Sequence, residues 1–166
     1  MPTMHPCEPV DVEYTDTARF RFTNSVAILA TPRQLFEIFV DADSWPRWAG
    51  VITTVAWTSE PPYGVGTTRT VHMLGGLVGE EEFLAWEPER RMAFRFNASS
   101  TKGIHAFAEA YDIVPTDGGC RLTWTLAMHG TAVTNLSISV VRPVMNLLFR
   151  RFLRRLSALA AEKYPG

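Results

Sequence analysis

The chain has 166 residues, which is enough for one domain with a sizeable core. Hydrophobic residues make up 46% and charged residues 20%, and the formal net charge of −1 excludes the basic footprint of a nucleic-acid-binding protein. Its two cysteines, Cys7 and Cys120, are too few for a disulfide framework. Residues 1–20 contain several acids and no apolar run, so no secretory signal is predicted and a cytoplasmic location is expected.

The two ends of the chain differ in character. Residues 1–17 are rich in proline, threonine and acids, so we expect a poorly ordered tail followed by a single domain over residues 18–166. The most apolar stretch, residues 137–149, is interrupted by Arg142 and Pro143. No transmembrane segment is therefore predicted.

The first structured segment alternates with a period of two. Its apolar residues from Phe20 to Ile28 fall on even positions, which predicts a strand. Thr31 is a good helix-capping residue and opens a helix directly after this strand. A second short helix is expected to carry Trp45 and Trp48.

Six strand-like runs follow, separated by turns rich in glycine and proline. They cover residues 51–58, 66–74, 81–86, 91–97, 105–114 and 120–128. Short strands joined by tight turns favour an antiparallel meander.

From about Thr134 the apolar period becomes helical. The stripe consists of Met145, Leu148, Phe149, Phe152, Leu153, Leu156 and Leu159. The opposite face carries Arg150, Arg151, Arg154 and Arg155. This long C-terminal helix must bury its stripe, and the sheet is the available partner, so the predicted fold class is α+β.

Five short motifs occur in a specific order along the chain. They are S-V-A-I-L-A-T-P-R-Q-L-F at 25–36, D-x-x-x-W-P-R-W at 41–48, G-V-G-T at 64–67, E-P-E-R-R-M-A-F-R-F at 87–96 and Y-D-I-V-P-T-D-G-G-C-R-L-T-W at 111–124. Their order and spacing resemble the START-related ligand-binding superfamily, often called SRPBCC, in its polyketide cyclase/dehydrase group. The resemblance covers roughly residues 20–163.

The resemblance implies a helix-grip fold. In this fold a curved seven-stranded antiparallel sheet wraps around the C-terminal helix, with two short helices after the first strand and a cavity between sheet and helix. Members bind or transform apolar small molecules such as polyketides, lipids and sterols. The apolar side chains expected to line the cavity here are Trp45, Trp48, Val71, Met73, Phe83, Phe94, Phe96, Phe107, Trp124, Met128, Met145, Phe149 and Phe152.

In proteins of this type the Trp-x-x-Trp segment closes one end of the grip. Two arrangements of Trp45 and Trp48 fit the sequence. Either one ring packs into the core while the other faces the cavity mouth, or both rings belong to the core.

Three polar residues are candidates for chemistry in the cavity. Arg69 shares its strand parity with Val71 and Met73, so it points inward if they do, and it could then hold a ligand oxygen. Some aromatase/cyclases of the resembled group use a cavity arginine in this way. The alternative is an arginine at a strand end that reaches solvent.

Glu109 and Tyr111 share one strand face with His105. If this face is inward, they become polar cavity groups that could orient a ligand or move a proton, with Arg69 as a partner for the carboxylate. The opposite face carries three alanines that would also suit a cavity, and buried glutamates are rare, so Glu109 in solvent is the alternative.

The sequence supports three hypotheses of function. The first is a carrier or binding protein for an apolar small molecule, and the second is a polyketide aromatase/cyclase or dehydrase that uses Arg69, Glu109 and Tyr111 in the same cavity. The third is a cavity-free structural domain. No histidine or cysteine pair has metal-ligand spacing, so no metal and no cofactor are predicted. The basic helix face fits either a solvated surface or contact with an anionic membrane or acidic carrier protein, and the oligomeric state is left open.

Overall fold

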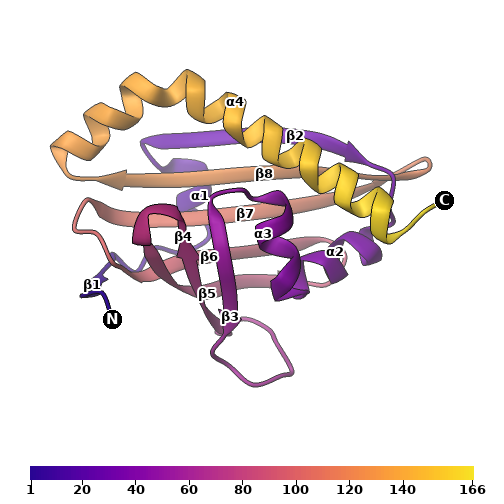
Figure 1. Ribbon diagram of the computed structural model, residues 1–166, viewed down its shortest axis with the longest axis horizontal. Coiled ribbons are helices and arrows are strands. Elements are labelled where there is room, and N and C mark those ends of the chain that lie inside the picture. Colours follow the sequence, from indigo (N-terminus) through magenta and orange to yellow (C-terminus); the bar gives the residue numbers. More distant parts are fainter.

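The computed structural model describes residues 1–166 and shows an antiparallel sheet that curls around one long helix (Figure 1). The seven strands of its main path lie in the order β2-β8-β7-β6-β5-β4-β3. They are β2 (Phe20–Ile28), β3 (Ile52–Trp57), β4 (Thr68–Met73), β5 (Val78–Glu87), β6 (Arg91–Ser99), β7 (Ile104–Thr116) and β8 (Gly119–Gly130). The helices are α1 (Tyr14–Thr17), α2 (Pro32–Val40), α3 (Trp45–Trp48) and α4 (Ala132–Lys163), with the short 3-10 helices η1 (Ala42–Ser44) and η2 (Leu74–Gly76).

This architecture confirms the predicted α+β helix-grip fold. Consecutive strands from β3 to β8 are neighbours, as expected of a meander, and β2 closes the order beside β8. Helices α2 and α3 sit at one end of the curl, where both contact α4 (Figure 1).

The entry into α2 follows from local sequence. The side chain of Thr31 accepts a hydrogen bond from the backbone of Gln34 at 3.2 Å, and the side chain of Gln34 accepts one from the backbone of Thr31 at 2.9 Å. This capping box satisfies two backbone donors that a helix start leaves free. It orients the helix so that Leu35 and Phe39 are fully buried.

The N-terminal segment, residues 1–17, differs from the poorly ordered tail that its composition predicts. Strand β6 pairs with β7 only as far as Arg95, and beyond that point β1 (His5–Pro6) takes over as a partner of β6. The backbone N–H of Glu8 then donates to the carbonyl of His105 on β7 at 2.7 Å. The segment is ordered because it satisfies strand groups that the main path leaves unpaired.

The predicted C-terminal helix, α4, runs without a break through Arg142 and Pro143, the two residues that interrupt the apolar stretch of the sequence. Proline removes a backbone hydrogen bond, and the helix bends in its first half (Figure 1). Length and composition alone would let α4 cross a membrane, a property that core helices of soluble proteins share. The apolar window of α4 is only 11% buried, whereas Phe152 and Leu156 in the second half of the helix are buried in the core.

Candidate functional site

A cavity of about 130 Å³ lies between the concave face of the sheet, α3 and the second half of α4. Its wall is mostly aromatic and aliphatic. The lining side chains are Trp45, Trp48, Ala49, Val51, Ile52, Arg69, Val71, Met73, Glu81, Phe94, Phe96, Phe107, Glu109, Tyr111, Trp124, Leu126, Phe149 and Phe152.

Most of the apolar residues proposed from the sequence are in this wall. Three of them are not in the wall: Phe83 and Met128 belong to the core, and Met145 packs against it. The wall also contains residues that the sequence reasoning missed, above all Glu81. A signal for Glu81 was available, because it lies two positions before the inward Phe83 on the same strand.

Both tryptophans of α3 belong to the core, and both also line the cavity. Trp45 is 1% exposed and Trp48 is fully buried, and both line the cavity. The indole N–H of Trp45 donates to the carbonyl of Phe39 at 2.9 Å, which ties α3 to the end of α2. The indole N–H of Trp48 is buried and has no hydrogen-bond partner.

Arg69 points inward, so the alternative of an arginine in solvent is wrong. It lies directly across from Glu81 in the β4–β5 register, and its Nε donates to the Glu81 carboxylate at 2.5 Å. The guanidinium carbon lies 4.2 Å from the ring centre of Trp45 and 4.6 Å from that of Phe94. These aromatic faces stabilise the cation. Its Nη1, however, is buried without a partner.

Glu109 and Tyr111 also point inward, so the solvent-facing alternative for Glu109 is wrong. The Tyr111 hydroxyl donates to Oε2 of Glu109, and the indole N–H of Trp124 donates to the same oxygen at 2.8 Å. Ala106, Ala108 and Ala110 face the other side of the sheet, which α1 helps to cover. The small alanine side chains leave room for that cover.

His105 does not follow Glu109 and Tyr111 into the cavity. The β7–β8 register shifts between Ile104 and Ala106, and the extra residue turns the histidine to the outer face. Bulges of this kind cannot be read from an alternating pattern.

The buried carboxyl groups have perturbed acidities. Burial raises the pKa of Glu109 to about 7, an effect that the Tyr111 hydrogen bond opposes and the nearby charge of Glu81 reinforces. Burial also raises the pKa of Glu81, against the pull of Arg69. The pKa of Tyr111 is raised as well, first by burial and then by the adjacent Glu109.

The site therefore combines one cation with two carboxyl groups and a phenol inside an apolar wall. Glu81 already compensates the charge of Arg69. The second acid, Glu109, has a pKa near neutrality and can carry or release a proton at working pH.

Comparison with known proteins assigns the chain to a family. Residues 19–161 match the family described as polyketide cyclase/dehydrase and lipid transport. The chain belongs to this family. The resemblance seen in the sequence motifs is thereby confirmed.

Known proteins resemble the chain in sequence or in fold to different degrees. It is 54% identical to the uncharacterized proteins Rv2574 of Mycobacterium tuberculosis and Mb2604 of Mycobacterium bovis, over 98% of either chain. The hypothetical protein jhp0584 of Helicobacter pylori has a similar fold, with a TM-score of 0.72, 17% identity and coverage of 96% of this chain and 99% of that one. The di-domain aromatase/cyclase StfQ of the steffimycin pathway matches with a TM-score of 0.67 and 12% identity, over 86% of this chain and 51% of that one.

Proposed function

We propose that this family member binds a small, largely apolar molecule that carries a neutral acceptor oxygen. The observation that carries the proposal is a pair of buried donors. Nη1 of Arg69 and Nε1 of Trp48 have no hydrogen-bond partner, and both side chains line the cavity. An unsatisfied buried donor costs about 1–3 kcal/mol, and a ligand oxygen that accepts from either N–H would remove that cost.

The charges in the cavity favour a neutral oxygen over a carboxylate. Arg69 is already paired with Glu81, and Glu109 adds negative charge when it loses its proton. An anionic ligand would be repelled by these acids, whereas a carbonyl or phenol oxygen accepts hydrogen bonds without adding charge. The volume of about 130 Å³ is below the roughly 300–1,000 Å³ of drug-sized sites, which favours a molecule of about one ring.

A matched pair of ligands tests this proposal. Acetophenone and α-methylstyrene have nearly the same shape, but only acetophenone has a carbonyl oxygen. By calorimetric titration we expect the wild type to bind acetophenone about tenfold more tightly, as one added hydrogen bond predicts. Benzoate should bind more weakly than acetophenone.

Two tryptophan variants provide the control. Trp48→Phe removes an unpartnered N–H and should reduce the preference for acetophenone. Trp45→Phe removes an N–H that is already bonded to Phe39 and should leave the preference unchanged. Equal affinity of the wild type for both ligands would contradict the acceptor, and binding of neither would contradict a ligand cavity.

A second function, proton-transfer catalysis of the cyclase or dehydrase type, is favoured by Glu109. A buried carboxyl group with a pKa near 7 suits general acid–base work at neutral pH. With the ligand carbonyl held by Arg69, the Glu109 carboxylate would take a proton from the adjacent carbon, and the electron pair of that C–H bond would move into an enolate. Tyr111 would orient the carboxylate through its hydrogen bond.

A further inference from the structure

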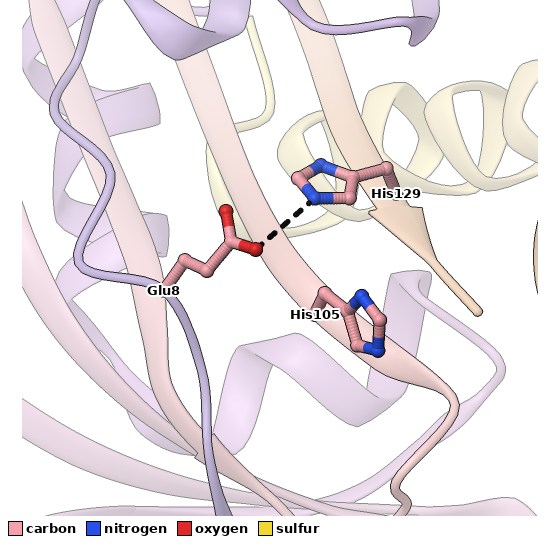
Figure 2. Close-up of side chains that lie close together, drawn as sticks. All are labelled: Glu8, His105 and His129. Carbon is pink, nitrogen blue, oxygen red and sulfur yellow. Dashed lines mark ion pairs between the residues drawn. The ribbon is translucent and has the colours of Figure 1, made fainter.

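Three side chains capable of binding a metal meet on the outer face of the sheet, on the side away from the cavity. They are Glu8 from the N-terminal segment, His105 from β7 and His129 from β8 (Figure 2). One ligand atom of each lies within 4.8 Å of the corresponding atoms of the other two. The spacing of these residues in the sequence gives no sign of the cluster, because it forms only when three separate segments come together.

The fold holds each of the three by its backbone. Ala106 pairs with His129 across β7 and β8, and the bulge before it turns His105 to the same outer face. The N–H of Glu8 donates to the carbonyl of His105, so the carboxylate reaches across toward both rings. Two ligands on neighbouring strands and a third tied to β7 by its backbone lower the conformational cost of binding an ion.

The distance between Glu8 and His129 is close to that between two ligands of a zinc site. Nε2 of His129 lies 3.4 Å from Oε1 of Glu8. Two ligands at about 2.0–2.1 Å from a tetrahedral Zn²⁺ stand roughly 3.3 Å apart. The hydroxyl of Tyr14 lies 2.8 Å from Nδ1 of His129, and such an outer contact fixes the ring and leaves Nε2 as the ligand atom.

We propose that Glu8, His105 and His129 bind a divalent transition metal of the zinc class, with solvent in the remaining position. Imidazole and carboxylate are the ligands that this class of ion accepts. The bound ion would clamp the N-terminal segment onto β7 and β8. This site is independent of the ligand cavity.

Calorimetric titration of the untagged full chain with zinc chloride tests the site. We expect one equivalent to bind and each of His105→Ala and His129→Ala to weaken the affinity by about tenfold or more, because each removes a ligand. His72→Ala removes an exposed histidine of β4 and should leave the affinity unchanged. Because His105 is exposed, His105→Ala should keep the circular dichroism spectrum of the wild type.

Two results would overturn the metal site. One is the absence of zinc binding by the wild type, which would reduce the cluster to the Glu8–His129 ion pair. The other is equal weakening by His72→Ala and His105→Ala, which would indicate nonspecific binding to surface histidines. Zinc should also raise the unfolding temperature of the wild type and not that of His105→Ala.

The outward face of the first half of α4 is apolar and exposed. Large apolar side chains line this face in the first half of the helix at helical spacing, and all are exposed. They are Val133, Leu136, Val140, Val144 and Leu147, with exposed fractions of 75%, 67%, 71%, 67% and 63%. A contiguous exposed stripe of this kind marks an interaction surface.

The same face continues as a basic surface. Arg151 and Arg154 are exposed and make no hydrogen bond or ion pair within the chain, whereas Arg150 and Arg155 are held by Asn24 and Arg47. An exposed apolar stripe next to unpaired arginines suits an anionic bilayer, because the apolar side chains can enter the acyl boundary while the neighbouring cations pair with lipid phosphates.

We infer that α4 docks the protein on an anionic membrane surface. Flotation with vesicles of phosphatidylcholine, alone or mixed equally with phosphatidylglycerol, tests the inference. We expect binding to the mixed vesicles, and about a tenfold loss of affinity for the Arg151→Gln/Arg154→Gln and Val140→Gln/Val144→Gln variants. Val114→Gln changes an exposed valine on β7 and is the matched control.

The competing occupant of this face is a second copy of the chain or another protein. Sedimentation velocity distinguishes the second copy, because a dimer that Val140→Gln/Val144→Gln dissociates would overturn the membrane assignment. Failure of the wild type to float with the mixed vesicles would overturn it as well. Equal loss in the Val114→Gln control would show that the stripe is not specific.

Discussion

Replacing Arg69 with methionine is expected to lower the free energy of unfolding by about 3–5 kcal/mol, because it leaves Glu81 buried without its partner. The side chains of Arg69 and Glu81 are 1% and 5% exposed, so water cannot replace the lost contact. Methionine has a similar length and still packs against Trp45 and Phe94. The measurement is urea unfolding followed by circular dichroism at neutral pH.

The double variant Arg69→Met/Glu81→Leu is the control for this loss. It removes both charges, and replacement of a whole buried pair by apolar residues is often neutral or stabilising. We therefore expect it to recover most of the stability that Arg69→Met loses. If the double variant were as unstable as the single one, packing of the arginine rather than the unpaired carboxylate would be responsible.

The pH dependence of the single variant has a definite sign. Burial already raises the folded-state pKa of Glu81 in the wild type. Without Arg69, which opposes this effect, the folded pKa of Glu81 lies further above its unfolded value. Stability from such a group is present below the unfolded pKa and is lost as the pH rises through the folded pKa. The deficit of Arg69→Met should therefore shrink as the pH falls toward about 5.

The sequence predicts the scaffold well, because the scaffold depends on periodicity. The even positions from Phe20 to Ile28 and the helical stripe around Phe152 are local signals, and the structure follows them. The alternation of side chains along a strand also correctly places Arg69 in the cavity wall together with Val71. Where a strand is regular, one reliable inward residue determines its neighbours at steps of two.

The sequence fails where pairing between distant segments decides the outcome. Parity alone would send His105 inward with Glu109, but the bulge reverses it. Composition describes residues 1–17 as a tail, yet the free edge beside Arg95 gives them hydrogen-bond partners. The preference of a residue for helix or strand does not indicate which distant segment it will pair with.

The buried polar groups link the stability of the domain to its proposed work. A core built only for stability would contain leucine at Glu81 and Glu109, since buried acids must be paired or neutralised. Here they sit beside an aromatic-flanked cation and two unpartnered N–H donors. Buried ionisable groups with perturbed pKa values cluster at sites of binding and catalysis, so this cavity is the expected functional site.

Glu109→Gln is expected to remove a large part of the pH dependence of stability. The folded pKa of Glu109 is about 7, against 4.5 for the ordinary group. Its contribution is fully present below about pH 4.5 and is lost as the pH rises through about 7, which amounts to about 3 kcal/mol. Unfolding free energies of the wild type and of Glu109→Gln, measured in urea from about pH 5 to pH 8, should therefore diverge with rising pH in favour of the variant.

The exposed Glu80 on β5 offers a matched control for the pH series. Glu80→Gln should track the wild type across the whole range, whereas a constant difference between the wild type and Glu109→Gln would contradict a raised pKa. Glu81 contributes with the same sign in both proteins, so it does not reverse the expected divergence.

The same variant separates binding from catalysis. Glutamine keeps an oxygen that can accept from Tyr111 and Trp124, so Glu109→Gln should still bind acetophenone, but it cannot take up a proton. In deuterated water a catalytic wild type would speed the exchange of the acetophenone methyl protons, with a rate that rises through about pH 7 as the carboxylate forms. Exchange that is lost in Glu109→Gln while affinity is retained would assign Glu109 as the base. Exchange no faster than in buffer, with binding intact, would leave the cavity a carrier site.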